Sequence, residues 1–259
     1  MKIDNLYPNV LIGSSGFVGK SLLKQIPFDF CYRSLNISEL KNTKNNIVVC
    51  AAPSAKKWYA NKFPEEDLEN IKNLIKVLKT IKANCFILIS TVDVYPLPKI
   101  VYEDSYIDIK ELHPYGFNRR YLEKFVKESF NSSLIIRLPG LVGNGLKKNA
   151  LYDLKHLNEI EKIDSRAVFQ FYPISYLWND IKKCLSRKLT LVNLSTEPLL
   201  INYVSEYCFN IKLKNSLSSM PPQYDMRSNF AKIMNGKKDY HYPKEIIIAE
   251  ILKYNKDLC

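Results

Sequence analysis

Three glycines spaced by three residues, Gly13, Gly16 and Gly19, constrain the fold of this chain more than any other feature. The apolar run 10–12 before them is typical of the end of a buried strand, and apolar residues recur at helical spacing from Phe17 onward. The glycines therefore lie at a strand-to-helix turn, where a positive φ, a close approach to a phosphate and tight helix packing all favour glycine. Free N–H groups at the start of the helix favour an anion there. The pattern predicts a dinucleotide-binding turn, with a tight turn that binds no ligand as the alternative.

Strand-like and helix-like segments alternate along the first 140 residues. The strand-like runs are 10–12, 28–33, 47–52, 85–90 and 134–137. Amphipathic helices are predicted from Pro64 and from Pro114, because proline favours the first turn and apolar residues then share one face. This alternation predicts an α/β fold, a parallel sheet wrapped by helices with any ligand at the carboxyl ends of the strands.

The ends of the second and third predicted strands bear on the choice of cofactor. An acidic residue at the end of the second strand would bind a ribose 2′-hydroxyl, whereas an arginine there accepts a 2′-phosphate. Arg33 stands there, which favours NADP, with NAD and an ordinary surface arginine as the alternatives. Ala51 and Ala52 end the third strand, and their small side chains would let a cofactor lie close.

Composition excludes several classes of protein. The 259 residues carry a net charge of +12, but the lysines are spread along the chain without a recognisable nucleic-acid module, so no nucleic-acid partner is expected. The six cysteines form no Cys-x-x-Cys pair and no histidine stands at metal-ligand spacing, which indicates a reducing compartment and no metal. No signal-peptide core or membrane-length apolar run is present, so a cytoplasmic protein with no membrane partner is expected.

The second half of the chain has a looser pattern. Its predicted elements are helices around 149–156, 175–185, 199–209 and 243–254, and a strand over 189–194. We expect residues 1–140 to form the dinucleotide-binding domain, joined by the strand at 189–194, and residues 141–259 to form mainly a small substrate domain.

Four motifs in order resemble the extended branch of the short-chain dehydrogenase/reductase superfamily, which contains nucleotide-sugar epimerases, dehydratases and reductases. They are Gly13-x-x-Gly16-x-x-Gly19, Ala51-Ala52, Ile89-Ser-Thr-Val-Asp-Val-Tyr95 and His113-Pro-Tyr-Gly-Phe-Asn-Arg119. The resemblance implies a Rossmann-like doubly wound parallel sheet with a shortened C-terminal substrate-binding domain. The cofactor-binding residues that it implies, besides Tyr115 and Arg119, are Gly13, Ser15, Gly16, Phe17, Val18, Gly19, Arg33, Ala51 and Ala52.

The resemblance also assigns catalytic roles to Tyr115, Arg119, Thr91 and Asp93. Tyr115 would exchange the proton, and Thr91 would hold the substrate oxygen. A phenol titrates near pH 10 on average, so an acid/base tyrosine needs a cation beside it. The family places a lysine four residues after the tyrosine, where this chain has Arg119, which can supply the charge and a ribose contact but no titratable proton. Alternatively, Tyr115 and Arg119 only line a nucleotide pocket, and Asp93 only caps a loop.

The sequence therefore predicts an NAD(P)-dependent oxidoreductase acting on a keto or hydroxyl group of a nucleotide-linked sugar. A nucleotide-sugar epimerase or dehydratase is one alternative, and a non-catalytic cofactor-binding sensor or structural protein is another. The expected partner is a small-molecule substrate. Members of the family commonly form a homodimer through the tyrosine-bearing helix and the helix before it, and the apolar face of residues 64–82 permits the same association.

Overall fold

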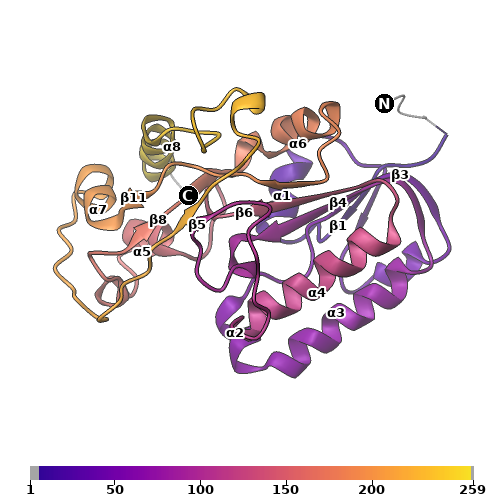
Figure 1. The fold of residues 1–259 in the computed structure, drawn as a ribbon, viewed down its shortest axis with the longest axis horizontal. Coiled ribbons are helices and arrows are strands. Elements are labelled where there is room, and N and C mark those ends of the chain that lie inside the picture. Colours follow the sequence, from indigo (N-terminus) through magenta and orange to yellow (C-terminus); the bar gives the residue numbers. More distant parts are fainter. Residues whose placement is uncertain (1–5, 258–259) are drawn as a thin grey trace. The chain divides into compact units, whose positions relative to one another are not determined.

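The computed structural model describes residues 6–257, in two units (Figure 1). The first unit comprises residues 6–96, 106–137 and 177–192, and the second comprises residues 97–105, 138–176 and 193–257. Residues 97–105 thus belong to the second unit, and residues 177–192, which overlap the strand predicted to join the first domain at 189–194, belong to the first. The outermost residues of the predicted domains, 1–5 and 258–259, lie outside the described part of the chain and include Cys259.

The first unit is built on a six-stranded sheet in the order β10-β6-β4-β3-β1-β2. Its strands are β1 (Val10–Ile12), β2 (Phe30–Tyr32), β3 (Lys44–Cys50), β4 (Lys82–Thr91), β6 (Ser133–Leu138) and β10 (Leu191–Asn193). The pairs β1·β2, β1·β3 and β3·β4 are parallel, so their carboxyl ends meet at one edge of the sheet. The α/β fold predicted from the alternation of apolar runs and amphipathic segments is confirmed.

Helices cover both faces of this sheet (Figure 1). They are α1 (Phe17–Leu23), α2 (Lys57–Lys62), α3 (Pro64–Leu78), α4 (Pro114–Ser129) and α6 (Leu177–Ser186). Helices α3 and α4 lie side by side, and each begins with the predicted proline. On the other face, the Trp178 backbone N–H at the start of α6 donates to Gln25 Oε1 just after α1, at 2.9 Å. Between β2 and β3 the chain forms a single 3₁₀ turn, Ile37–Leu40.

Alternate residues of the central strands supply the main core. Val10 and Ile12 of β1, with Val48 and Cys50 of β3, belong to one buried cluster with the apolar stripe of α3. That stripe consists of Ile71, Leu74, Ile75 and Leu78. Full burial of one such side chain contributes about 1.5–3 kcal/mol, so this face anchors the helices that carry the candidate site.

The second unit is made of short strand pairs and helices. Its elements are β5 (Lys99–Val101), β7 (Gly140–Val142), α5 (Ala150–His156), β8 (Val168–Phe169), β9 (Phe171–Pro173), β11 (Leu199–Leu200), α7 (Ile201–Phe209), β12 (Asp225–Met226) and α8 (Lys244–Lys256). The strands pair as β11·β8, β12·β5 and β7·β9. The sequence predicts the three helices, whereas strands of two or three residues are too short to show an alternating pattern.

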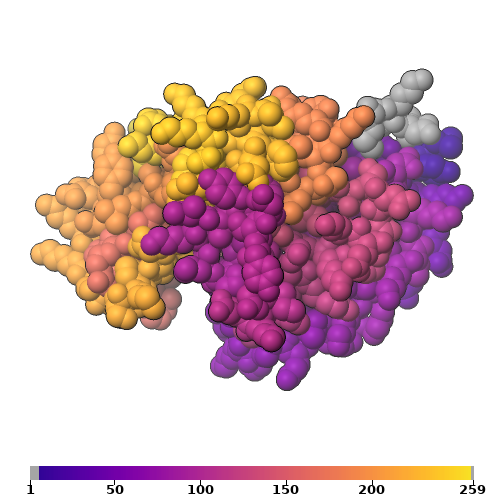
Figure 2. All heavy atoms as spheres, viewed as in Figure 1, coloured from indigo at the N-terminus to yellow at the C-terminus, as the bar shows by residue number. Residues whose placement is uncertain are grey.

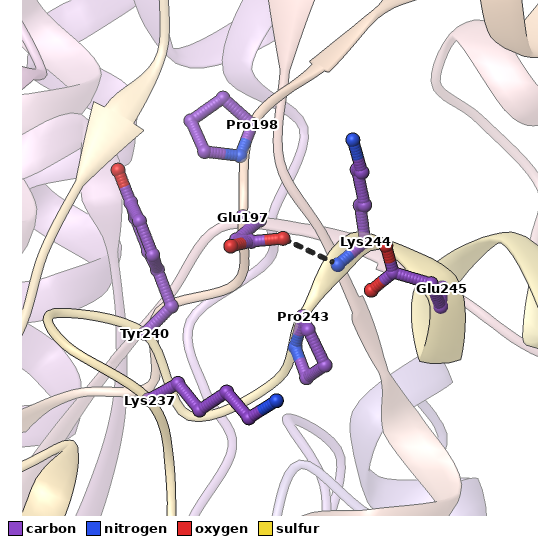
Figure 3. Close-up of a pocket in the computed structure, with 7 residues that line it drawn as sticks. All are labelled: Glu197, Pro198, Lys237, Tyr240, Pro243, Lys244 and Glu245. Carbon is purple, nitrogen blue, oxygen red and sulfur yellow. Dashed lines mark hydrogen bonds between the residues drawn. The ribbon is translucent and has the colours of Figure 1, made fainter.

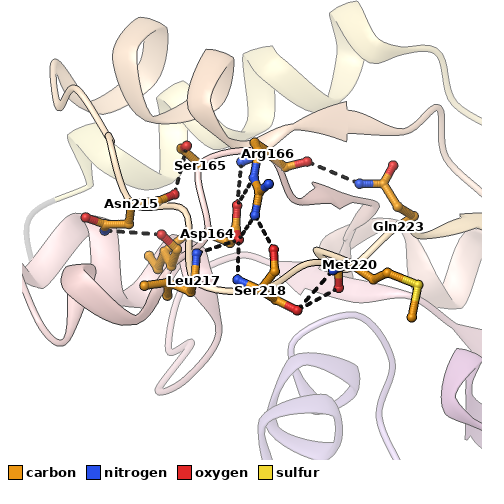
Figure 4. A network of polar contacts seen from close by, with 9 residues as sticks. Asp164, Ser165, Arg166, Asn215, Leu217, Ser218, Met220 and Gln223 are labelled. Atoms are coloured by element: carbon orange, nitrogen blue, oxygen red, sulfur yellow. Dashed lines mark hydrogen bonds and ion pairs between the residues drawn. The ribbon is translucent and has the colours of Figure 1, made fainter.

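Asp164 organises one edge of the second unit (Figure 4). Its carboxylate accepts hydrogen bonds from Arg166 Nη2 at 2.7 Å and from the Leu217 backbone N–H at 2.9 Å. Hydrogen bonds from the Arg166 side chain hold the pKa of this carboxyl well below its usual range, and the backbone donors add to the effect. The loop near residue 217 is thereby fixed to the segment that begins at Asp164.

Residues 6–257 contain no helix of the length and hydrophobicity needed to cross a membrane. Within the same residues, no group of three His, Cys, Asp or Glu side chains is arranged to hold a metal ion. Cys31 is an exposed thiol, and the buried cysteines among residues 6–257 are Cys50, Cys85, Cys184 and Cys208. Burial raises the pKa of Cys50 and of Cys184 to about 12, which keeps these thiols protonated and unreactive.

In the space-filling view, the indigo and purple residues of the first unit and the pink residues of its α4 region form one continuous surface (Figure 2). Residues far apart in sequence therefore build this unit together. This matters for the candidate site, because its side chains come from β4, α2, α3 and α4.

Candidate active site

The glycine turn joins β1 to α1, and its three glycines meet different requirements. Gly13 has a φ of +85°, and a Cβ there would lie 2.7 Å from the carbonyl oxygen of Ala51. A Cβ on Gly19 would lie 2.2 Å from the carbonyl oxygen of Gly13, closer than any real contact. Gly16 is exposed and has an ordinary φ of −74°, and the nearest atom to its added Cβ is 3.4 Å away. Packing therefore requires Gly13 and Gly19, whereas Gly16 presents an open backbone surface.

The other predicted cofactor residues lie at the carboxyl ends of neighbouring strands. Ser15 is exposed in the glycine turn, and Phe17 and Val18 begin α1 half-buried. Arg33 directly follows β2 and is exposed. Ala51 and Ala52 follow β3 and are half-buried, next to Gly13.

The Gly13 backbone N–H donates to the carbonyl oxygen of Tyr32 at 2.8 Å, which fixes the glycine turn against the end of β2. Since β1, β2 and β3 are adjacent and parallel, the structure brings the predicted cofactor residues to one edge of the sheet.

Thr91 and Asp93 follow at the end of β4. The Thr91 hydroxyl accepts the Asp93 backbone N–H at 3.2 Å and lies 3.3 Å from Asp93 Oδ2. Thr91 thus caps the 3₁₀ turn Val92–Val94, and its side chain is tied to the carboxylate of Asp93. The side chain that caps this turn is therefore that of Thr91, whereas the Asp93 side chain contacts Lys57 and His113.

Asp93 lies between two basic side chains. Lys57 Nζ of α2 is 2.6 Å from Asp93 Oδ1, and His113 Nε2 is 3.8 Å from the same oxygen. Burial opposes ionisation of Asp93, but His113 and the positive charge of Lys57 outweigh it and lower the pKa of this carboxyl. Asp93 is therefore a carboxylate at neutral pH and has no proton to donate.

Tyr115 is the second residue of α4 and is 5% exposed. Its backbone N–H donates to Asn61 Oδ1 at 3.0 Å, while the His113 ring caps the helix by accepting the Gly116 N–H at 3.1 Å. Burial raises the pKa of the Tyr115 phenol, and Asp93 adds to the rise, against the lowering by Arg119, Thr91 and Lys57. Tyr115 is therefore a neutral phenol at physiological pH and can donate its proton.

Arg119 lies over the face of the Tyr115 ring, with its guanidinium carbon 4.2 Å from the ring centroid. Its Nη1 lies 2.6 Å from Asp67 Oδ2, and its Nη2 lies 3.1 Å from Asp67 Oδ1 and 2.5 Å from the carbonyl oxygen of Ser54. Both terminal nitrogens are engaged by protein acceptors in a buried, forked ion pair. Three of the five guanidinium N–H groups are directed to these acceptors, and the ribose contact expected of Arg119 stays a prediction.

Lys57 and Asp67 are the two site residues that the sequence analysis missed. Helix α2, which carries Lys57, has six residues and one buried position, Ala60, so no apolar periodicity reveals it. A usable signal was present, since Lys57 follows the Ala51-Ala52 strand end, at the edge where ligands bind in open α/β sheets. Asp67 stands in the acidic first turn of α3, where acidic residues normally stabilise the helix end and indicate no further role.

The second unit has a separate hollow of about 440 Å³ (Figure 3). Its lining residues are Glu197, Pro198, Lys237, Tyr240, Pro243, Lys244 and Glu245. The Lys244 backbone N–H donates to Glu197 Oε2 at 2.8 Å, which ties the start of α8 to the wall of the hollow. The hollow contains none of the predicted site residues.

No protein-family model matches the chain, and no curated protein matches it in sequence. Solved structures match along almost its whole length. One is a dTDP-4-dehydrorhamnose reductase from Bacillus anthracis in complex with NADP, at 16% identity and a TM-score of 0.72, covering 95% of this chain and 97% of that chain. Another is a UDP-N-acetylglucosamine 4-epimerase from Methanobrevibacter ruminantium, at 12% identity and a TM-score of 0.74, covering 96% and 97%.

A third is a variant of the UDP-glucuronic acid 4-epimerase from Bacillus cereus in complex with a UDP-sugar and NAD, at 16% identity and a TM-score of 0.71, covering 95% and 97%. At such identities the likeness is one of fold. It confirms the Rossmann-like fold that the four motifs imply. The activities of these proteins are known for those proteins only.

Proposed function

We propose that the protein is an NAD(P)-dependent oxidoreductase that reduces a keto group of a nucleotide-linked sugar. The observation that carries the proposal is the cluster of Thr91, Tyr115 and Asp93 at the edge of the sheet where the open glycine turn also lies. The shared fold of reductases and epimerases of nucleotide sugars supports the substrate class. We propose that the first unit binds the cofactor and that the second supplies the substrate-binding residues.

The residues of the glycine turn fit a dinucleotide. Gly16 leaves an opening that a Cβ would fill, and Ser15, Phe17 and Val18 are its neighbours at the start of α1. We assign the pyrophosphate to this turn and a 2′-phosphate to Arg33, with Ala51 and Ala52 allowing close approach, so NADP is the proposed cofactor and NAD the alternative. A reduced nicotinamide, when bound, supplies a hydride.

Thr91 and Tyr115 handle the substrate oxygen in this proposal. The Thr91 hydroxyl, which lies 3.3 Å from Asp93 Oδ2, turns its one O–H to the substrate carbonyl oxygen and orients it, and Tyr115 donates its proton as that oxygen gains negative charge. The O–H bond of Tyr115 breaks, its electron pair stays on the phenolate, and the proton ends on the new sugar hydroxyl. The Arg119 guanidinium over the ring stabilises the phenolate. The raised pKa of Tyr115 keeps the phenol protonated before the reaction, which suits reduction.

The ionised state of Asp93 bears on the dehydratase alternative. An acidic residue at this position would have to hold a proton to protonate a leaving hydroxyl, and the lowered pKa of Asp93 opposes that. The epimerase alternative involves no such acid and is separated by experiment. An epimerase retains its cofactor tightly through purification, whereas a reductase exchanges it freely.

Cofactor binding is tested with two glycine variants. Gly16→Val should fold normally and bind NADPH at least about tenfold more weakly, because overpacking costs about 1–3 kcal/mol and 1.4 kcal/mol is tenfold. Gly19→Val should fail to fold, since its Cβ meets the backbone of Gly13. Arg33→Ala should weaken NADPH but leave NADH unchanged. Wild-type affinity of Gly16→Val for both cofactors, measured by fluorescence titration, contradicts the proposal.

Proton transfer is tested with Tyr115→Phe on a panel of nucleotide-linked keto sugars. Loss of a general acid costs about 10²–10⁴-fold in rate, so turnover should fall by that factor while NADPH affinity changes little. Cofactor binding without turnover of any keto sugar or any epimerisation favours the non-catalytic alternative.

A further inference from the structure

We propose that Lys57 is a positioning residue of the site, which neutralises Asp93 and thereby lets Tyr115 part with its proton. The catalytic consequence rests on the proposed function above, whereas the charge pairing of Lys57 is a property of the chain itself. The role that the Tyr-x-x-x-Arg motif gives to Arg119 alone is, in this view, shared with a lysine from a different helix.

The first step is the pairing of Arg119. Its two terminal nitrogens reach both carboxylate oxygens of Asp67, and the side chains of the pair are 6% and 9% exposed. An opposite charge at this distance cancels most of the field that Arg119 exerts on groups farther away. Arg119 lies over the ring of Tyr115 and lowers the pKa of its phenol, with a positive charge that Asp67 partly offsets.

The second step is the charge of Asp93. This carboxylate raises the pKa of Tyr115, since a negative charge opposes formation of a phenolate nearby. Lys57 Nζ, 2.6 Å from Asp93 Oδ1, offsets it. Removal of Lys57 therefore takes this positive charge away from a half-buried, ionised Asp93, while the more distant His113 stays 3.8 Å from Asp93 Oδ1.

The groups that act on Tyr115 come from five elements, and Lys57 of α2 is the more exposed member of its ion pair with Asp93. Arg119 and His113 belong to α4 or its cap, Thr91 ends β4, and Asp93 lies in the turn after it. Asp67 of α3 acts through Arg119. The Lys57 side chain is 40% exposed, so its loss costs little folding energy, and its effect can be separated from unfolding.

Lys57 also fixes the geometry of the substrate-orienting hydroxyl. Asp93 holds Thr91 through a 3.3 Å contact with its hydroxyl, and Lys57 holds Asp93. Lys57 of α2 thus holds Asp93 in place, and Asp93 in turn holds the hydroxyl of Thr91 at the end of β4. Lys57 itself needs no contact with the substrate for this role.

The test compares Lys57→Met with a matched control, Lys62→Met, which removes the same charge from an exposed position of the same helix. Carboxyl NMR should show the pKa of Asp93 rise in Lys57→Met and remain unchanged in Lys62→Met. The limb of the pH–rate profile that reports the pKa of Tyr115 should move to higher pH by about one unit, because loss of a nearby opposite charge shifts a pKa by roughly this amount. Lys57→Arg should keep the wild-type profile.

A double variant makes the test specific. If Lys57 acts by cancelling Asp93, then Lys57→Met combined with Asp93→Asn should return the Tyr115 limb toward its wild-type position, because neither charge remains. A role confined to packing predicts no such reversal. An unchanged Asp93 pKa in Lys57→Met, or an unchanged Tyr115 limb, overturns the inference.

A failure of the proposed function is distinguishable from a failure of this inference. If the wild type reduces no keto sugar, the phenol is titrated directly by tyrosinate absorbance, with Tyr115→Phe subtracted. A higher Tyr115 pKa in Lys57→Met then supports the inference, and an unchanged one overturns it, whatever the protein catalyses.

Discussion

Two ionic clusters in the first unit differ in how far water reaches them. In one, the side chains of Glu123 and Arg137 are 0% and 1% exposed. In the other, the side chains of Asp93 and Lys57 are 16% and 40% exposed. A buried pair is held in one charge state by the cost of leaving either partner alone, whereas a half-exposed pair can rearrange at little cost. The Glu123–Arg137 cluster is suited to fixing the positions of the elements around it, and the Asp93–Lys57 cluster to setting the charge near Tyr115.

The buried cluster clamps the helix of Tyr115 to the strand of Thr91. Glu123 lies two turns after Tyr115 on α4, and its Oε1 accepts the Ser90 hydroxyl at 2.6 Å, one residue before Thr91. Arg137 of β6 donates to both oxygens of Glu123, at 3.0 and 2.7 Å, so the carboxylate is fully satisfied. Burial opposes ionisation of Glu123, but Arg137 and the Ser90 hydroxyl lower the pKa of its carboxyl.

The largest expected effect comes from breaking this clamp. Glu123→Gln leaves Arg137 charged and buried without its carboxylate, so the free energy of unfolding should fall by about 3–5 kcal/mol. Glu128→Gln is the matched control on the same helix, since Glu128 is 63% exposed and 3.9 Å from Lys124, and should cost no more than about 0.5 kcal/mol. Denaturant unfolding followed by circular dichroism measures both. Equal losses in the two variants contradict the distinction between clamp and surface.

Arg119→Lys should give a smaller loss. Lysine keeps the charge but cannot reproduce the forked contact with Asp67 and the bond to Ser54, so we expect about 1.5–3 kcal/mol of lost stability. Activity per folded molecule should stay within a few-fold of wild type, because the counter-charge over Tyr115 remains. The control is Arg120→Lys, whose side chain is 37% exposed. A large gain of activity in Arg119→Lys contradicts the pairing of Arg119 with Asp67 as its main role.

The difference between the clusters explains what the sequence could predict. The strand ends, the glycine turn and the start of α4 follow from local periodicity and from Pro114, and the motifs place Thr91 and Tyr115 together. The partners of the charged residues depend on tertiary packing. Arg119 meets Asp67, 52 residues away, and Lys57 meets Asp93, 36 residues away.

Residue type alone could not predict these pairings. An arginine one turn after a tyrosine looks like the counter-charge of a phenolate, and only the position of α3 shows that Asp67 takes up its terminal nitrogens. Lys57 is one of 38 basic residues, and its position after the Ala51-Ala52 strand end indicates the edge of the sheet but not its pairing with Asp93. The sequence therefore predicts which edge of the sheet carries the site better than it predicts which charge serves which group.

The smallest expected effect is the pH dependence contributed by Asp93. Its pKa is lowered in the folded protein, so its stabilising contribution is present above the unfolded value of about 3.9 and is lost as the pH falls through the folded value. Asp93→Asn removes this contribution, so stability of the variant should fall less steeply than that of the wild type below about pH 4. Unfolding measured from pH 7 to pH 3 checks it, with Asp108→Asn as a control because Asp108 is an acidic loop residue that forms no ion pair within residues 6–257. The same steepness in wild type and Asp93→Asn would mean that Asp93 titrates alike in the folded and unfolded chain. The contrast with the buried clamp would then rest on exposure alone, and the coupling of Asp93 to Lys57 and His113 would have to be given up.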